Sequence, residues 1–239
     1  MAASARVSIP IMHYLNCNPE RDRMHAVLVP RRTLLVGATS ALAAQAVAPL
    51  ALAASPLIVT PGQTEGPFYP LTFPADMDGD LVRVKGQAAQ AVGAVTHVSG
   101  RILDRRGEPV RGAMVEIWQC DARGIYNHPG DSGQRRRDTA FQGYGRVEVN
   151  AGGRYAFRTI RPVSYPGRTP HIHFKVHAPG VGRLTTQMYV AGERQNAADG
   201  VLNGIRDRKA RESVIVALAE AGDIEPGALR GTFDIVLAV

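Results

Sequence analysis

Short apolar runs separated by turn signals follow one another after residue 94, and they limit what this chain can fold into. Two stretches, Val115–Trp118 and Tyr155–Arg158, show side chains that alternate between two faces, as strands do. The runs are Val95–Leu103, Ala113–Gln119, Arg154–Ile160, His171–His177, Leu184–Val190 and Thr232–Val239. Strands of this length and spacing predict an all-β domain, built as a β-sandwich or a barrel.

Two long connections and one helical segment interrupt this pattern. Residues 121–153 and 161–170 have little apolar periodicity. Long loops inside a compact domain are usually functional or disordered, so we expect the chemistry in these two. The helical candidate is Asp207–Ala221, which begins with a capping-type aspartate. Its β-branched run Val214–Val216 leaves a strand open as the alternative.

The first 54 residues have the pattern of an export signal. Arg31 and Arg32 precede a long Ala-rich stretch that ends at Ala51–Ala53, a small-residue pattern suited to a signal peptidase. This twin arginine predicts a Tat signal, with the Tat translocon as a transient partner and a periplasmic or exported protein. Met24 is a natural start for such a leader, which would make residues 1–23 an over-extended start. The alternative is a membrane anchor over 34–54, which its polar residues and alanines disfavour.

The remaining chain divides into an irregular arm, 55–94, and a β-domain, 95–239. Without the five Arg, Glu20 and Asp22 of the leader, the formal net charge falls from +7 to +4. Both signs are interspersed, which argues against nucleic acid as a partner. For the triplet Arg135–Arg137, a solvated loop and a role in steering an anionic substrate both stay open. Cys120 is alone after the leader, so no intrachain disulfide forms, and its apolar neighbours suggest a buried thiol.

Two histidines share one face of the predicted strand over 171–177. Because strand side chains alternate, His171, His173 and Lys175 point the same way, and two His at i and i+2 form a bidentate clip for a metal. Such pairs are more often structural or exposed, so the pair alone does not establish a metal site.

Two loop tyrosines and an arginine accompany this pair. Tyr165 stands six residues before His171, Arg168 stands three before it, and Tyr126 lies upstream. Loop tyrosines flanked by Gly and Pro are unusual choices for packing alone. We therefore expect the tyrosine oxygens and the histidines to reach a common centre.

Several motifs of this chain occur in the order typical of one enzyme family. They are Val115–Gln119, the loop of Tyr126, Phe141–Arg146, Arg168–Phe174, Thr186–Tyr189 and Phe233–Leu237. Together they resemble the intradiol ring-cleavage dioxygenases, especially the protocatechuate 3,4-dioxygenase type, over nearly all of the chain from residue 64. The resemblance implies the β-sandwich of that family, with long loops around the active site.

The resemblance also implies a non-haem Fe(3+) site. By position, Tyr126 and His171 would be equatorial ligands, while Tyr165 and His173 would be axial, with a solvent ligand beside them. Phenolate oxygen suits the hard ferric ion better than thiolate does. A bound metal also lowers the pKa of its tyrosine ligands far below their usual value of about 10.

The implied reaction is intradiol cleavage of a catecholic aromatic by O2, giving a cis,cis-muconate-type diacid. Protocatechuate or a related diol would be the substrate. Tyr165 would leave the metal and take up a substrate proton, Arg168 would stabilise charge on the substrate, and Gln187 would line the pocket. We interpret Trp118 as a core aromatic and Thr64–Tyr69 as scaffold near the pocket mouth. The paired chains of protocatechuate enzymes leave a homo-oligomer open.

Two other functions are compatible with parts of the pattern. The strands suit a non-catalytic transthyretin-like or carbohydrate-binding sandwich equally well, because a fold alone does not settle function. A zinc hydrolase is the second alternative, with His171 and His173 as ligands. Neither alternative needs the two loop tyrosines.

Overall fold

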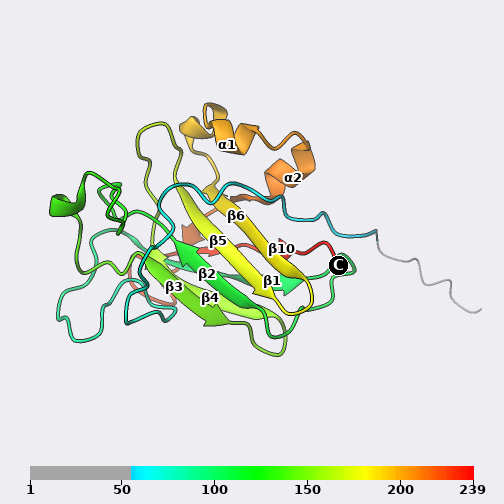
Figure 1. Cartoon of the computed structure of the whole chain (residues 1–239), viewed down its shortest axis with the longest axis horizontal. Helices are drawn as coiled ribbons and strands as arrows, with labels where there is room; N and C mark the ends of the chain where they lie inside the picture. The colour runs from blue at the N-terminus through cyan, green and yellow to red at the C-terminus, as the bar shows by residue number, and fades with distance from the viewer. Residues whose placement is uncertain (1–54) are drawn as a thin grey trace, which may run out of the picture. The chain divides into compact units, whose positions relative to one another are not determined.

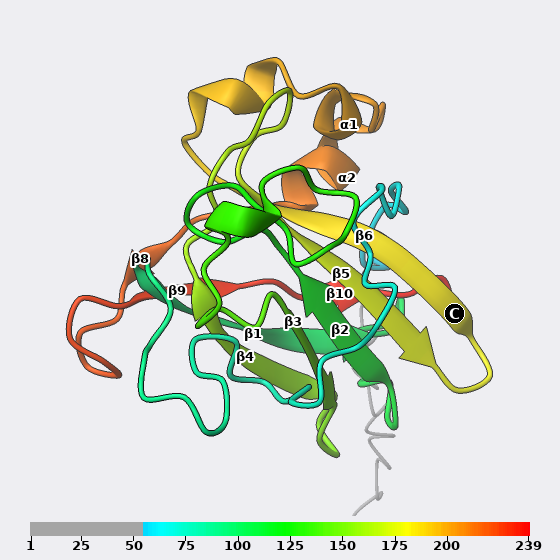
Figure 2. The ribbon, with the colours of Figure 1, turned by 60° about the vertical axis from the view of Figure 1, so that its left-hand side comes forward.

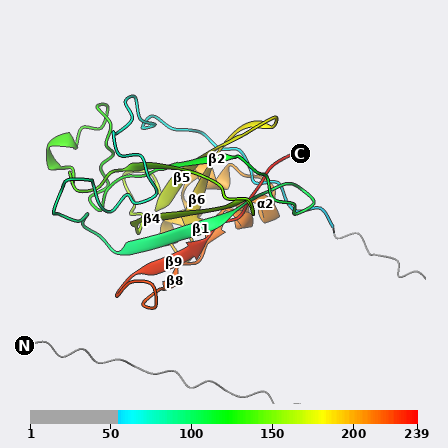
Figure 3. The same ribbon diagram turned by 90° about the horizontal axis from the view of Figure 1, so that it is seen from below.

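The computed structural model describes residues 55–239, and two five-stranded sheets pack face to face within this part (Figures 1 and 3). The first sheet contains, in order, β3 (Tyr144–Glu148), β2 (Met114–Trp118), β5 (His171–Ala178), β6 (Gly182–Val190) and β7 (Ile215–Val216). The second contains β10 (Ile235–Val236), β1 (Val95–Leu103), β9 (Leu229–Thr232), β8 (Ala219–Glu220) and β4 (Arg154–Ile160). The predicted all-β sandwich is confirmed. The predicted signal region, 1–54, lies outside the described residues.

β1 organises the second sheet. It pairs antiparallel with β4, while β9 and then β10 run parallel to it. In the first sheet, β3, β2, β5 and β6 are antiparallel neighbours, and β7 joins β6 in parallel. β2 and β5 therefore lie in the middle of the first sheet.

β5 is buried on both of its faces. Ile172, Phe174 and Val176 point into the core between the sheets and are at most 1% exposed. The opposite face carries His171 and His173, which are also almost fully buried. Burial on that outer face requires a second covering layer, and the loops 119–143 and 161–170 together with the arm supply it.

The arm 55–94 ties the two sheets together before it reaches this outer face. The Thr60 amide donates to the carbonyl oxygen of Val236 at 3.0 Å, and the Gln63 amide donates to that of Thr185 at 2.8 Å. Figure 1 shows this segment, in cyan, passing across β6 and β5. Its next residues lie over the face that carries the two histidines.

The predicted helix over Asp207–Ala221 is wrong in its length. It is only the six-residue α2 (Arg208–Ser213), and its N-cap is Asp207, which accepts a hydrogen bond from the Ala210 amide at 3.0 Å. The following β-branched residues pair with β6 as β7, with Ile215 opposite Tyr189. None of the helices within residues 55–239 is long and apolar enough to span a membrane.

Four elements were not expected from the sequence, besides the 3-10 turns η1 (Gln134–Arg136) and η2 (Arg194–Ala197). They are β3 inside the supposed loop 121–153, the two-residue β8, α1 (Gly200–Asn203), and β9, which shares only Thr232 with the predicted run Thr232–Val239. Figure 2 shows α1 and α2 together beyond the end of the sheet where β6 finishes.

Candidate metal centre

Tyr126 is held in place by the loop between β2 and β3. Its amide donates to Asp131 at 2.9 Å, and its carbonyl oxygen accepts from the side chain of Gln134. Asp121 braces the start of the loop by accepting from the amides of Ile125 and Asp138. The phenol is 2% exposed, and its hydroxyl has no hydrogen-bond partner among the described residues.

Tyr165 lies on the second loop, in a tight turn closed by a hydrogen bond from the Arg168 amide to the Tyr165 carbonyl at 2.9 Å. Gly167 in this turn has φ +81°. The two tyrosine loops touch at Gly124, where a Cβ would lie 3.4 Å from the Cβ of Tyr165. The Tyr126 and Tyr165 rings are 5.6 Å apart and nearly perpendicular.

The histidine pair starts β5. The Nε2 atoms of His171 and His173 lie 3.2 Å apart, close enough to bond to each other or to share one ion between them. The Nδ1 atom of His171 lies 2.6 Å from the carbonyl oxygen of Thr169 and donates to it, which leaves Nε2 unprotonated. The Tyr165 ring is 5.5 Å from His171, and the Tyr126 ring is 6.1 Å from His173. The structure thus brings the four predicted ligands together.

Burial sets the protonation of these four side chains. It lowers the pKa of His171 to about 4, with help from the nearby Arg168, and it lowers the pKa of His173 further below its ordinary value. Burial raises the pKa of Tyr126 and of Tyr165, although Arg168 opposes the rise for Tyr165. Without a cation, the imidazoles are therefore neutral and both phenols keep their protons near neutral pH.

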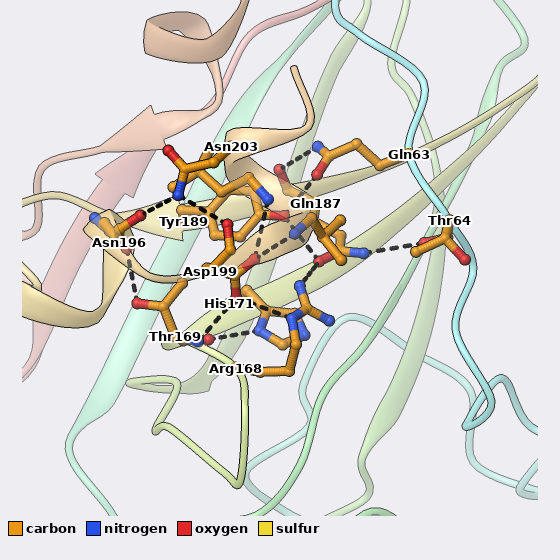
Figure 4. Close-up of polar contacts among 12 residues, drawn as sticks. Gln63, Thr64, Arg168, Thr169, His171, Gln187, Tyr189, Asn196, Asp199 and Asn203 are labelled. Atoms are coloured by element: carbon orange, nitrogen blue, oxygen red, sulfur yellow. Dashed lines mark hydrogen bonds and ion pairs between the residues drawn. The ribbon is translucent and has the colours of Figure 1, made fainter. Parts of the chain in front are cut away.

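Arg168 is fixed by two partners on other elements, as Figure 4 shows. Its Nε donates to Asp199 at 2.9 Å, and its Nη2 donates to Gln187 at 2.5 Å. Asp199 also accepts from the amide of Thr169 at 3.0 Å. The guanidinium therefore has a defined orientation next to Tyr165.

Gln187 is fully buried opposite His173 on the neighbouring strand. Its Nε2 donates to the carbonyl oxygen of Thr64 at 3.0 Å, and its Oε1 accepts from Tyr189 at 3.0 Å (Figure 4). The Tyr189 hydroxyl also lies 2.6 Å from Gln63 on the arm. This network links the arm to the strand that faces the histidines.

Sequence reasoning missed three residues of this site. Asp199 gave no signal, because its partner Arg168 is 31 residues earlier in the chain. Tyr189 was detectable, since it lies two residues after Gln187 on the same face of one strand. Phe68, placed only in the scaffold, stacks on Tyr126 with ring centroids 4.8 Å apart.

Trp118 is buried as predicted, but it belongs to a separate cluster on the outer face of the first sheet. Cys120 is also buried, which confirms the expected thiol, and burial raises its pKa to about 12. Two residues of the triplet Arg135–Arg137 form hydrogen bonds near their own loop and not with the four-residue centre. The Arg136 carbonyl accepts from Arg123, and the Arg137 side chain donates to the carbonyl of Asp138.

The donor set suits a hard, highly charged cation. This place offers two imidazoles and two phenols. Within residues 55–239 no group of three His, Cys, Asp or Glu side chains could hold a metal ion. The buried, unpartnered hydroxyl of Tyr126 and the 3.2 Å approach of the two Nε2 atoms fit a shared ion. A trivalent cation would remove the phenol protons and neutralise the resulting phenolates.

The chain is similar to several known proteins. A family model described as a dioxygenase matches residues 64–239. The chain is 37% identical to the protocatechuate 3,4-dioxygenase beta chain of Burkholderia cepacia, over 72% of this chain and 76% of that protein. It is 29% identical to hydroxyquinol 1,2-dioxygenase of Corynebacterium glutamicum, over 59% of this chain but only 50% of that protein.

A solved structure has the same fold. The dioxygenase domain of a dioxygenase and carbohydrate-binding protein fusion from Streptomyces sp. SirexAA-E superimposes with a TM-score of 0.59. It is 34% identical, and the match covers 76% of this chain and 99% of that domain.

Proposed function

The chain belongs to the intradiol ring-cleavage dioxygenase family, and from this premise we propose that it cleaves a catecholic diol at a ferric centre built from Tyr126, Tyr165, His171 and His173. It is an oxidoreductase of the dioxygenase type. Membership of this family is incompatible with both alternatives, the non-catalytic sandwich and the zinc hydrolase. The family uses non-haem Fe(III).

The convergence of the two Nε2 atoms beside a buried phenol is the observation that carries this proposal. The atoms are 3.2 Å apart, and the Tyr126 hydroxyl is unpartnered among residues 55–239. A buried polar atom without a partner costs free energy unless a ligand satisfies it. Iron held here would act as a Lewis acid toward the oxygens of the diol.

Tyr165 and Arg168 would act on the substrate. Tyr165 is the more exposed tyrosine. Once a bound ferric ion had removed its phenol proton, its Oη would be able to accept a proton from a diol hydroxyl. Arg168 remains charged, and its guanidinium, oriented by Asp199 and Gln187, would stabilise negative charge that develops on the substrate. Since both ends of the Gln187 amide are bonded within the protein, Gln187 would act mainly by holding Arg168.

We infer that the substrate is a protocatechuate-like diol. The relative named as a protocatechuate 3,4-dioxygenase subunit shares 37% identity over 72% of this chain, whereas relatives named as hydroxyquinol or chlorohydroxyquinol enzymes share 29% and 34% over 59%. The same relative, named as a beta chain, motivates assembly of this chain into an oligomer, either with copies of itself or with a homologous chain. The twin arginine at 31–32 motivates Tat-dependent export to the periplasm.

Iron content, colour and oxygen uptake test the proposed function. Wild type purified from iron-supplied cells is expected to hold one iron per chain and to be red-brown, because tyrosinate-to-iron charge transfer absorbs visible light. Tyr126→Phe removes one phenolate and is expected to lose or shift this colour. Oxygen uptake on protocatechuate, catechol and hydroxyquinol then identifies the preferred diol.

Two results would contradict different parts of this proposal. A folded, colourless wild type that holds zinc in place of iron would refute the ferric centre. Faster uptake on catechol or hydroxyquinol than on protocatechuate would refute the substrate alone. Tyr144→Phe is a suitable control, since this buried tyrosine lies on β3 outside the four-residue centre.

A further inference from the structure

The two histidines of the centre are held in different ways. The Nδ1 of His171 donates to the Thr169 carbonyl at 2.6 Å, which fixes the plane of its ring. The Nδ1 of His173 is buried and has no hydrogen-bond partner within the described part of the chain. Metal-binding histidines almost always anchor their second nitrogen to a carboxylate, a carbonyl or water. His173 therefore needs another means of orientation.

Trp118 lies directly against His173. The two residues are cross-strand partners on β2 and β5. Their ring centroids are 4.6 Å apart and their planes differ by 10°, so the imidazole lies flat on the indole. Trp118 is 1% exposed and His173 is 2% exposed, so water does not separate them.

Trp118 is itself held in place by neighbouring side chains. The Tyr69 ring meets it edge to face at 5.0 Å, and the Tyr69 hydroxyl donates to Glu116 at 2.7 Å. The Lys175 ammonium lies 3.2 Å from the centre of the Tyr69 ring. These contacts come from the arm and from both strands, so the indole cannot turn without disturbing several neighbours.

We propose that Trp118 is a positioning residue whose stacked indole orients His173 for metal binding in place of the missing hydrogen bond. This inference rests on the proposed ferric centre. A stacked aromatic neighbour permits rotation within the ring plane but resists tilting out of it. On the arm side, Gly66 lies near the edge of the ring, since a Cβ there would be in ordinary van der Waals contact with the Cε1 of His173 at 3.5 Å.

Iron affinity measured by chelator competition tests this inference on Trp118→Leu and Trp118→Phe. The leucine variant is expected to bind iron about 10-fold to 100-fold more weakly, as the loss of an outer partner of a metal ligand does. The phenylalanine variant keeps a smaller ring and is expected to lose about threefold, within the range of an aromatic pair. A shift of the visible absorption band should accompany the weaker binding.

Phe174→Leu is the matched control, because Phe174 lies on the opposite face of the same strand and points into the core. It is expected to lower the melting temperature of the metal-free protein and leave iron affinity unchanged. Unchanged iron affinity in either Trp118 variant would overturn the inference, as would an equal loss in Phe174→Leu. The phenylalanine variant decides the question if the leucine variant does not fold. A wild type that binds no iron would refute the ferric centre itself.

Discussion

Asp199 shows how one buried carboxylate can organise a catalytic loop. It is 1% exposed and accepts from the Arg168 side chain and from the amides of Thr169, Val201 and Leu202. Burial alone would raise the pKa of Asp199, but the amides and the Arg168 guanidinium together hold it below its ordinary value. One residue thus caps α1 and orients the arginine next to Tyr165.

Replacing Asp199 by Asn should reduce both stability and activity. Breaking a buried ion pair from one side costs about 3 kcal/mol, and losing the support of a catalytic arginine should lower kcat/KM roughly 10-fold to 100-fold. Because the folded pKa is depressed, the stabilisation is present at neutral pH and is lost as the pH falls below about 4. Thermal unfolding of both metal-free proteins from pH 7 to pH 3 should therefore show a difference that shrinks with acidification.

Asp234→Asn is the control for this prediction. Asp234 pairs with Arg101 at 2.8 Å on the second sheet, and a third of its side chain is exposed. A partly exposed pair contributes up to about 1 kcal/mol, so this variant should remain active and nearly as stable as wild type. A stability difference between Asp199→Asn and wild type that stays constant with pH would contradict the proposed charge interaction.

The proposed ligand residues were named from the sequence, but several residues that contact them or their neighbours were not. His171 and His173 are two positions apart, and strand alternation alone places them on one face. Their approach to Tyr126 and Tyr165 depends on loops from different parts of the chain, which the unusual loop tyrosines suggested and the family resemblance made specific. Trp118 was rightly predicted to be buried, but strand pairing, which sequence does not show, places it on His173.

At the scale of elements, prediction succeeded where one face of a strand packs on an apolar core. The bounds of β1 and β4 were predicted without error, because their apolar runs end at clear turn residues. β3 was missed because it is a short strand that pairs only with β2, and its sequence Tyr144–Glu148 includes Gly145 and three outward polar or aromatic side chains. A two-residue strand such as β8 is too short to give any periodicity.

The arm is the element whose contact with the centre can be tested most sharply. Gly66 has φ +73°, where a side chain costs about 1–2 kcal/mol. Gly66→Ala should therefore lower stability by about that amount. The added Cβ would be in van der Waals contact with the Cε1 of His173 at 3.5 Å, so a shift of the strained turn would reach that ring and should weaken iron binding. Calorimetry and chelator competition measure the two effects separately.

Gly86→Ala separates the effect of backbone strain on stability from the effect of contact with His173 on iron binding. Gly86 lies on the same arm with φ +81°, but a Cβ there would meet nothing within 4 Å. It should lose similar stability while its iron affinity stays at the wild-type value. Equal iron affinities in the two variants would show that the arm does not help to orient His173.

At the scale of the whole molecule, the centre and the twin arginine are physically consistent with each other. The site is buried and combines the arm, two loops and two neighbouring strands, so it forms only after the chain has folded. A metal that binds such a site is best loaded before export, and the Tat pathway is the one that a twin-arginine signal addresses. An iron enzyme with this construction would therefore cross the membrane already folded.

Residues 1–54, fused to a reporter that folds before transport, are expected to carry it to the periplasm. Changing Arg31 and Arg32 to Lys should block this transport, because the signal is read as an arginine pair and lysine lacks the planar guanidinium. Fractionation of cells that express each fusion measures the exported share, and a single Lys variant at each position shows whether both arginines are needed. If the double Lys variant is exported as well as the original, the chain uses another route, and the ferric centre must then be loaded outside the cytoplasm.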